Sequence, residues 1–332
     1  MNVRRECVLP PLLLMNNVII SINPKAGRTS PMQKAEELCF RLREKGFTVD
    51  LLTDLDEVVE KANVRFATGD LRVLAGVGGD GTAATLVNRT APGTPITLLA
   101  AGTANLLSKH YRLGSNPKRL ADIIERRKIK TFDAGIARCF SGSDTNSNGG
   151  SYERLFLVMV SCGFDADVVS GVHRHREERY RQGHKKGAHI SYFSYIKPVL
   201  HSLTGYKFPN INVEIIPKEA GAAVVVPVRW AFLFNINRYG WGLPLAPFAK
   251  EDDGSLDAVL FSGRTVFHAF VYTALAQCFS LHRYLPSAVL QQGVKFRLTS
   301  EADVPFQLDG DPGGCLPLEI EAVPNRVTFL IR

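Results

Sequence analysis

Short apolar runs alternate with stretches of helical spacing along the first third of the chain. Residues 18–22 form an uncharged, mostly β-branched run that predicts a buried strand, and residues 32–45 place apolar side chains three and four positions apart, which predicts a helix. The alternation continues with expected strands at 47–52, 71–77 and 95–100 and expected helices at 56–68, 82–89 and 105–111. This order predicts a parallel sheet covered by helices.

The pattern changes after Asp133. A polar, glycine-rich stretch at 141–150 is followed by β-rich runs at 155–160, 211–216, 223–234, 256–261, 294–298 and 306–308. Short strands with few helices between them predict a mostly antiparallel second domain. Residues 265–281 are the longest uncharged apolar run, and we expect a packed helix there, because a membrane span needs about 20 strongly apolar residues.

Charge and cysteine usage narrow the functional classes. The net charge of +8 favours anionic partners such as nucleotide phosphates or lipid headgroups. Nucleic acid is not expected, because no basic run is interleaved with aromatic residues. The six cysteines are scattered without a C-x-x-C pair, which argues against a zinc site or a disulfide framework and suits a reducing compartment.

The first residues resemble a signal peptide only in part. Arg4 and Arg5 precede an apolar stretch, but Pro10 and Pro11 interrupt it and no small-residue cleavage site follows. We therefore expect a cytoplasmic location, with Met15 as an alternative start of translation.

Three glycine-containing loops each follow an expected strand of the first domain. They are Asn23-Pro24-Lys25-Ala26-Gly27-Arg28, Gly78-Gly79-Asp80-Gly81-Thr82 and Gly102-Thr103-Ala104-Asn105. The carboxyl ends of parallel strands share one edge of the sheet, so the loops should converge there with backbone N–H groups facing anions. One such loop could be an ordinary turn, but three on one edge predict a phosphate site.

The second loop also fits the G-x-G-x-x-G pattern of dinucleotide-binding proteins. Those proteins need a carboxylate about 20 residues later, whereas no acidic residue lies between Asp80 and Asp122. An aspartate within the loop would repel phosphate unless a cation lay between them. We therefore expect Asp80, Mg²⁺ and a nucleotide phosphate to form one arrangement, as phosphoryl transfer from ATP requires.

Asn-Pro-x-x-Gly, Gly-Gly-Asp-Gly-Thr and Gly-Thr-x-Asn, in that order, resemble the diacylglycerol kinase catalytic family, which includes bacterial lipid kinases and sphingosine kinases. Further matching segments are Asp133-Ala134-Gly135, Gly163-Phe164-Asp165-Ala166, Tyr239-Gly240, residues 250–257 and Asp309-Gly310-Asp311. The resemblance covers nearly the whole chain from residue 18 onward.

The resemblance implies an α/β nucleotide-binding domain similar to phosphofructokinase and NAD kinase, followed by a β-sandwich. The first domain would span residues 15–132 and be joined by the chain end at 318–332, and the β-rich lipid-substrate domain would span 133–317. The implied activity is transfer of the ATP γ-phosphate to a lipid hydroxyl, with Mg²⁺ required. The implied location is cytoplasmic with peripheral membrane contact. The resemblance is also compatible with a homodimer.

The resemblance also implies roles for individual residues. The ATP-binding positions are Asn23, Pro24, Lys25, Ala26, Gly27, Thr53, Gly78, Gly79, Asp80, Gly81, Thr82, Gly102, Thr103 and Asn105. Asp309 is the first choice for the general base and Asp311 the second, although an Asp-Gly pair can simply form a turn. Asp80 and Asp133 would form the carboxylate network of the catalytic metal. Lys250, Asp253 and Ser255 would form a structural magnesium site, with a solvated acidic hairpin as the alternative.

The chain departs from the family pattern at Ala84, Thr85, Leu106 and Asp311, where many or some members carry Asn, Glu, Asp and Glu. Because of these departures, a second possible function is that of a catalytically impaired regulator that binds nucleotide. An NAD kinase acting on a soluble substrate is the competing enzyme. The basic stretch at 173–186 is either a solvated helix face or a contact for anionic lipid headgroups. The motifs do not encode the acceptor, so diacylglycerol, sphingoid bases and related lipids all fit.

Overall fold

The computed structural model describes residues 15–22, 31–139, 152–181, 205–240 and 243–332. The expected loops at 23–28 and 141–150 therefore lie outside the described residues. The elements of the N-terminal part are β1 (Asn17–Ile22), α1 (Pro31–Glu44), β2 (Thr48–Leu52), α2 (Leu55–Ala67), β3 (Leu71–Gly78), α3 (Asp80–Arg89), β4 (Pro95–Ala100), α4 (Leu106–His110), α5 (Pro117–Arg126) and β5 (Ile129–Cys139). In the described segments, none of the helices has both the length and the apolar character needed to cross a bilayer.

The rest of the chain is mainly β-structure. Its elements are β6 (Tyr152–Phe156), β7 (Met159–Cys162), α6 (Phe164–Arg181), β8 (Ile211–Ile216), β9 (Val224–Val228), β10 (Trp230–Phe234), β11 (Leu256–Phe261), α8 (Val266–Gln277), η5 (Leu281–Tyr284), β12 (Ala288–Gly293), β13 (Lys295–Thr299), β14 (Pro305–Leu308), β15 (Asp311–Cys315) and β16 (Leu318–Leu330).

The N-terminal part is a parallel sheet with helices packed against it. Strands β2, β1, β3 and β4 lie side by side in that order and run parallel. Every residue of β3 and β4 is buried, as expected for strands with helices on both faces. The predicted α/β fold of this region is confirmed.

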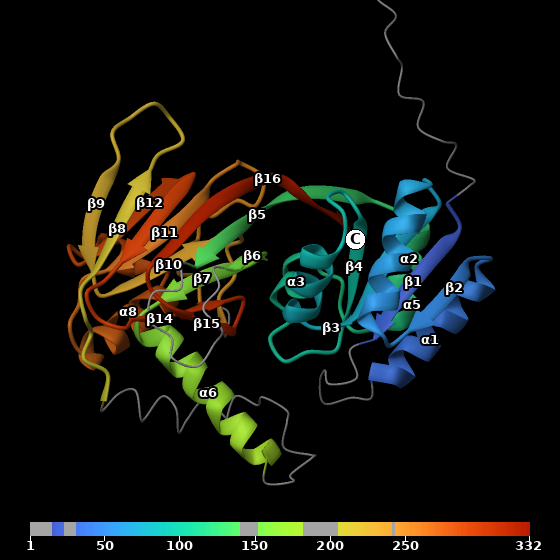
Figure 1. Cartoon of the computed structure of the whole chain (residues 1–332), viewed down its shortest axis with the longest axis horizontal. Coiled ribbons are helices and arrows are strands. Elements are labelled where there is room, and N and C mark those ends of the chain that lie inside the picture. The colour runs from blue at the N-terminus through green and yellow to red at the C-terminus, as the bar shows by residue number, and fades with distance from the viewer. Residues whose placement is uncertain (1–14, 23–30, 140–151, 182–204, 241–242) are drawn as a thin grey trace, which may run out of the picture.

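Two strands run from the α/β part into the sandwich. The last residues of β16 pair in parallel with β4, whereas its first residues pair antiparallel with β13. Strand β5 pairs antiparallel with β16 along both parts. Figure 1 shows β5 and β16 crossing between the two parts side by side. The expected division at 132/133 falls inside β5.

The sandwich consists of the far half of this sheet and a second, six-stranded sheet. The second sheet has the order β12-β11-β10-β7-β14-β15, and all its pairs are antiparallel. Apolar side chains of both sheets, including Phe156, Phe296 and Phe306, form a core between them. The prediction of a mostly antiparallel C-terminal part is confirmed.

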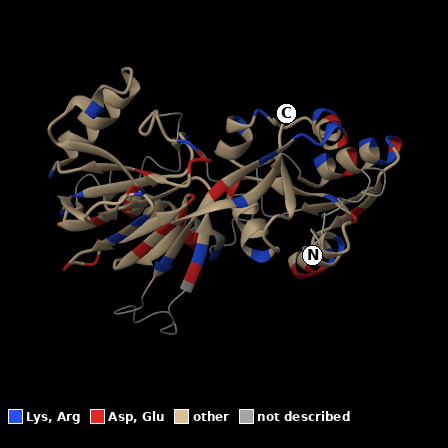
Figure 2. Ribbon diagram, turned by 90° about the horizontal axis from the view of Figure 1, so that it is seen from above, with Lys and Arg blue, Asp and Glu red and all other residues tan. Residues whose placement is uncertain are grey.

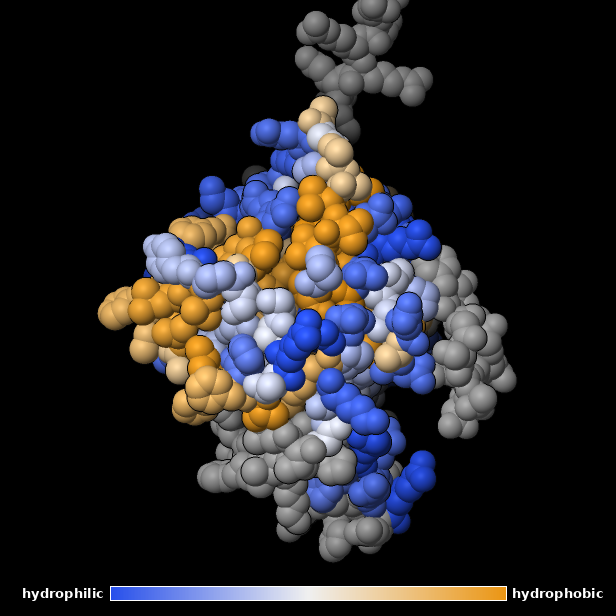
Figure 3. Space-filling view, turned by 90° about the vertical axis from the view of Figure 1, so that its left-hand side faces the viewer, coloured by the Kyte–Doolittle hydropathy of each residue, from blue (hydrophilic) through white to orange (hydrophobic). Residues whose placement is uncertain are grey.

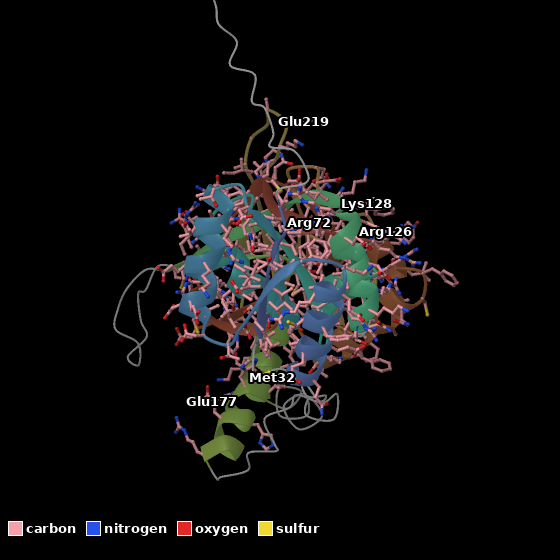
Figure 4. All side chains as sticks on the ribbon, turned by 90° about the vertical axis from the view of Figure 1, so that its right-hand side faces the viewer. Met32, Arg72, Arg126, Lys128, Glu177 and Glu219 are labelled. Carbon is pink, nitrogen blue, oxygen red and sulfur yellow. The ribbon has the colours of Figure 1, made fainter. Side chains whose placement is uncertain are left out.

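Two expected strands are each divided by the structure. Residues 155–160 contain the end of β6 and the start of β7, and residues 223–234 contain β9 and β10, with each pair split between the two sheets. Helix α5 was not predicted, although Asn116 caps it and Pro117 occupies its first turn. Arg72 on β3 donates to the Ile124 carbonyl oxygen at 3.1 Å, near the end of this helix. Figure 4 views this end of the molecule, with Arg126 and Lys128 labelled near the end of α5.

Candidate active site

The second and third glycine loops meet at the carboxyl ends of the neighbouring strands β3 and β4. The Ala101 N–H donates to the Gly78 carbonyl oxygen at 2.8 Å. A Cβ atom at Gly102 would lie 2.7 Å from the Gly79 Cα atom, which is closer than real Cβ contacts allow. Glycine is therefore required where the two loops touch, and the predicted convergence of these two loops is observed.

Asn105 fixes the shape of the third loop. Its side-chain oxygen accepts from the Gly102 N–H at 3.0 Å, and its amide nitrogen donates to the Gly102 carbonyl oxygen at 2.8 Å. Its backbone is left-handed, with φ of 50°, a conformation that asparagine adopts more readily than most residues. Asn105 thus holds the loop closed before α4 begins.

Asp80 joins the two loops. Its carboxylate oxygens accept from the backbone N–H groups of Leu106 and Leu107 at 2.9 Å each, at the start of α4. Burial raises the pKa of Asp80, and these two N–H donors oppose that rise. A carboxylate has about four lone-pair sites, so it can accept both bonds and still face a cation.

The other predicted nucleotide residues lie around this edge or outside the described residues. Asn23, Pro24, Lys25, Ala26 and Gly27 belong to the segment that the structure does not describe. Thr53 is exposed directly after β2, Gly81 lies in the first turn of α3, and Thr82 is buried there. Thr103 lies in the loop after β4, between Gly102 and Asn105, whose side chain bonds to Gly102.

Lys34 is a cation at this edge that was not among the predicted site residues. Its Nζ donates to the Ala100 carbonyl oxygen at 3.1 Å, next to the third glycine loop. The available signal was its position in the first turns of α1, since a helix that follows a parallel strand begins at the carboxyl edge of the sheet.

Asp309 forms the tight turn between β14 and β15. Its carboxylate accepts three backbone N–H bonds, from Leu157 and Val158 at 2.8 Å and from Met159 at 3.0 Å. The residue adopts a left-handed conformation, with φ of 51°. Burial raises the pKa of Asp309 to about 6, the three N–H donors oppose the rise, and the negative charge of Asp80 adds to it. The two carboxylates are therefore near enough to interact, although they come from opposite halves of the chain.

Asp311 lies in a different environment. Its Oδ2 pairs with Arg154 at 2.9 Å, and its side chain is 42% exposed. The same oxygen would lie 3.9 Å from a Cβ atom at Gly81. The turn thus reaches the glycine loop of the α/β part, and the charge of Asp311 is balanced by Arg154.

A side-chain clamp fixes the two parts around this site. The amide of Asn88 on α3 donates to the Leu155 carbonyl oxygen at 2.9 Å and accepts from the Leu155 N–H at 2.8 Å. Leu155 lies only two residues before Leu157, the first donor to Asp309. Asn88 therefore sets the position of Asp309 relative to α3. This role of Asn88 was not predicted, because nothing in a lone helical asparagine shows its tertiary partner.

The Asp133 carboxylate holds backbone rather than another acid. It accepts from Gly254 N–H at 2.7 Å and from Asn325 N–H at 2.8 Å. Among the residues that the structure describes, no three His, Cys, Asp or Glu side chains are grouped to hold a metal ion. Asp133 thus ties β5 to the 250–255 turn and to β16, and its expected network with Asp80 stays a prediction.

The second predicted magnesium site, at Lys250, Asp253 and Ser255, lies in that turn. Asp253 Oδ1 accepts from the Ser255 N–H at 3.0 Å, and Oδ2 accepts from the Gln292 amide at 3.1 Å. Asp257 Oδ2 is buried and has no hydrogen-bond partner in the described part of the chain. Burial raises the pKa of Asp257 to about 6, and the charge of Asp253 adds to the rise. Oxygen atoms are the ligands that a hard cation prefers, and the magnesium role of Lys250, Asp253 and Ser255 stays a prediction.

A buried polar cluster lies directly behind Asp309. Gln307 donates to Ser161 Oγ at 2.9 Å, and its oxygen accepts from the Gly310 N–H at 2.7 Å. Asp165 accepts hydrogen bonds from Ser161 and Tyr239, and burial raises its pKa. The cluster supports the Asp309 turn from inside the sandwich.

The three residues that depart from the family pattern, Ala84, Thr85 and Leu106, fit their surroundings without changing the loops. Ala84 is fully buried on the inner face of α3, and Thr85 Oγ1 donates to the Gly81 carbonyl oxygen at 2.8 Å. Leu106 contributes its backbone N–H to Asp80. None of the three changes breaks the loop geometry.

Comparison with known proteins agrees with this arrangement. Residues 17–137 match the model of the diacylglycerol kinase catalytic domain, and residues 158–331 match that of the YegS C-terminal NAD kinase beta sandwich-like domain. The chain belongs to the diacylglycerol kinase family. A diacylglycerol kinase from Mycobacterium tuberculosis (strain H37Rv) is 25% identical over 317 residues, covering 93% of each chain.

Solved structures agree on the fold of this family member. A putative diacylglycerol kinase from Bacillus anthracis has a TM-score of 0.68 at 18% identity and covers 96% of both chains. Another structure of a putative diacylglycerol kinase from that organism has a TM-score of 0.62 at 17% identity and covers 96% of this chain and 97% of its own. The α/β and sandwich architecture is therefore that of the family, and the family match supports a kinase.

Proposed function

We propose that this kinase transfers the γ-phosphate of ATP to the hydroxyl group of a lipid. The observation that carries the proposal is the position of Asp309. Its carboxylate is held by three backbone N–H groups, feels the charge of Asp80 and has a pKa of about 6. A base with a pKa near neutral pH is ionised in the cell and still accepts a proton readily.

In the proposed reaction, Asp309 accepts the proton of the lipid hydroxyl. The hydroxyl oxygen forms a bond to the γ-phosphorus, the bond from that phosphorus to the β–γ bridging oxygen breaks, and ADP leaves. The glycine loops after β3 and β4 bind the phosphates through backbone N–H groups, and Lys34 adds positive charge at the same edge.

Mg²⁺ bound with ATP offsets the negative charge of the phosphates. Asp80 is the residue that fits this ion, because its carboxylate faces the loops and keeps lone pairs after binding the start of α4. Asp253 and Asp257 fit a second ion with a structural role in the 250–257 turn. We place the enzyme in the cytoplasm, in peripheral contact with a membrane.

The test is transfer of label from γ-labelled ATP to a total lipid extract dispersed in detergent, with NAD as a parallel soluble acceptor. We expect label in the lipid phase with wild-type protein and its loss in Asp309→Asn. Labelled NAD without labelled lipid would favour the NAD kinase alternative. ATP binding with no transfer to any acceptor would favour a regulator, the alternative raised by Ala84, Thr85 and Leu106.

A further inference from the structure

Helix α8 and the segment after it carry large apolar side chains on the molecular surface. On α8, Phe267 is 71% exposed and Phe270 is 72% exposed, one turn apart. Phe279, Leu281 and Tyr284 follow at 91%, 42% and 68%. Together with Phe248, 63% exposed, these residues form what we call the α8 face. Figure 3 views this end of the molecule and shows hydrophobic side chains gathered on one side of it.

The α8 face is a single surface. The Ser280 hydroxyl donates to the Pro244 carbonyl oxygen at 3.0 Å, and a ring nitrogen of His282 lies 2.9 Å from the Leu245 carbonyl oxygen. These contacts bring the segment before Phe248 against η5. The Arg283 guanidinium lies over the Phe248 ring at 5.2 Å and over the Tyr284 ring at 4.6 Å from the centroids.

The exposed side chains are not needed to pack the helix. Helix α8 is held on the second sheet by Ala269, Tyr272 and Ala276, and the Tyr272 ring stacks on Phe261 at 4.2 Å. A helix that is apolar all round is normally covered on every side. Phe279 is also left-handed, with φ of 54°, which is unfavourable for a bulky residue and points to a functional constraint.

Charge around the α8 face identifies its partner. No Asp or Glu occurs from residue 258 to residue 300, while Arg264 directly precedes α8 and Arg283 lies in η5. Figure 2 shows that the helical end of the sandwich is almost free of charged residues. Exposed aromatic rings beside arginine suit the interface of a bilayer that contains anionic lipid.

We propose that the α8 face docks this protein on anionic phospholipid membranes by inserting Phe267, Phe270 and Phe279 below the headgroups. This inference rests on the proposed function, because docking would bring the active site to its lipid acceptor. It differs from the basic stretch at 173–186 in using apolar insertion as well as charge.

The test is co-sedimentation of the full chain, without ATP, with vesicles of phosphatidylcholine alone or mixed with phosphatidylglycerol. We expect Phe267→Ser/Phe270→Ser to weaken binding to the mixed vesicles by about tenfold to a hundredfold. Arg283→Gln should weaken it about fivefold on the mixed vesicles and have no effect on phosphatidylcholine alone. The matched control is Phe40→Ser on α1, where a phenylalanine that is 57% exposed lies in the α/β part.

Three outcomes would overturn the proposal. One is equal vesicle binding by wild type and the double variant. If the double variant does not fold, the same comparison is made with Phe279→Ser. Another is an equal loss in Phe40→Ser. The third is a change in oligomeric state by light scattering with vesicle binding unchanged, which would make the face a contact between two copies. Lipid phosphorylation in detergent micelles is measured separately and should persist in the double variant, so failure of docking and failure of the proposed kinase activity are distinguishable.

Discussion

Two acidic turns of the sandwich look alike in sequence but lie in different environments. The turn at Asp309-Gly310-Asp311 reaches the second glycine loop of the α/β part, and burial, with a smaller contribution from the charge of Asp80, raises the pKa of Asp309 to about 6. The turn at 250–255 faces β5 and β16, where its backbone binds Asp133.

The difference shows that an acidic turn acquires its chemistry from the strands beside it. In the first turn, the Asp309 carboxylate is held by N–H groups at 157–159, and the neighbouring Asp311 lies close to Gly81 of the second glycine loop. In the second turn, acidic and amide groups connect three segments that are distant in sequence. The first is suited to proton transfer and the second to holding the two parts of the chain together.

The largest effect is expected on kcat, when the single variants Asp309→Asn and Asp311→Asn are compared. Loss of the base should lower kcat on the order of a thousandfold, whereas loss of Asp311 should lower it less than tenfold, because Asp311 is already paired with Arg154. The measurement is kcat with saturating ATP, with circular dichroism confirming the fold of both variants. Equal losses in the two variants would remove the distinction between them.

The next largest effect is expected on ATP affinity, when the contact between the second and third glycine loops is disrupted. In Gly102→Ala, the new Cβ would lie 2.7 Å from Gly79 Cα, so the two loops must separate. We expect ATP affinity to fall about tenfold to a hundredfold, which corresponds to the usual cost of such overpacking. Equilibrium binding of a fluorescent ATP analogue measures this change.

Gly205→Ala is the matched control for that substitution, since nothing lies within 4 Å of its new Cβ. Its ATP affinity should equal that of wild type. Unchanged ATP affinity in Gly102→Ala would mean that the contact of the two loops does not form the nucleotide site.

The smallest effect is expected on the free energy of unfolding, when the bonds of the 250–255 turn are changed. Asp133→Asn removes a charged acceptor of the Gly254 and Asn325 N–H groups, and we expect a loss of about 1–3 kcal/mol in the free energy of unfolding. Asp252→Asn breaks only an exposed ion pair with Lys130 and should cost less than about 1 kcal/mol. Urea unfolding compares the two, and a smaller loss in Asp133→Asn than in Asp252→Asn would contradict this role of the turn.

Much of the parallel sheet and its edge could be predicted from the sequence. Strands β1, β3 and β4 are mostly apolar runs, and the glycines at the ends of β3 and β4 must lie at the same edge in any parallel arrangement. Asp309 was the first choice for the base through its motif, and the geometry around it favours that choice over Asp311.

The remaining features depend on contacts between distant residues. The division of 223–234 between two sheets is decided by strand partners, not by local apolar pattern. The Asn88 clamp and the bonds of Asp133 join residues more than 60 positions apart, and local sequence carries no signal for such pairs. The expected metal role of Asp133 stays a prediction, and its bonds to Gly254 and Asn325 are a structural role that its motif did not indicate.

The most direct test of the site is titration of the Asp309 carboxyl carbon by NMR in protein labelled at aspartate. The signal is assigned by its absence from Asp309→Asn. We predict a pKa of about 6 in wild type and a lower pKa in Asp80→Asn, because that variant removes a neighbouring negative charge. A pKa near the ordinary aspartate value of about 4, unchanged by Asp80→Asn, would contradict the placement of Asp309 against the nucleotide edge.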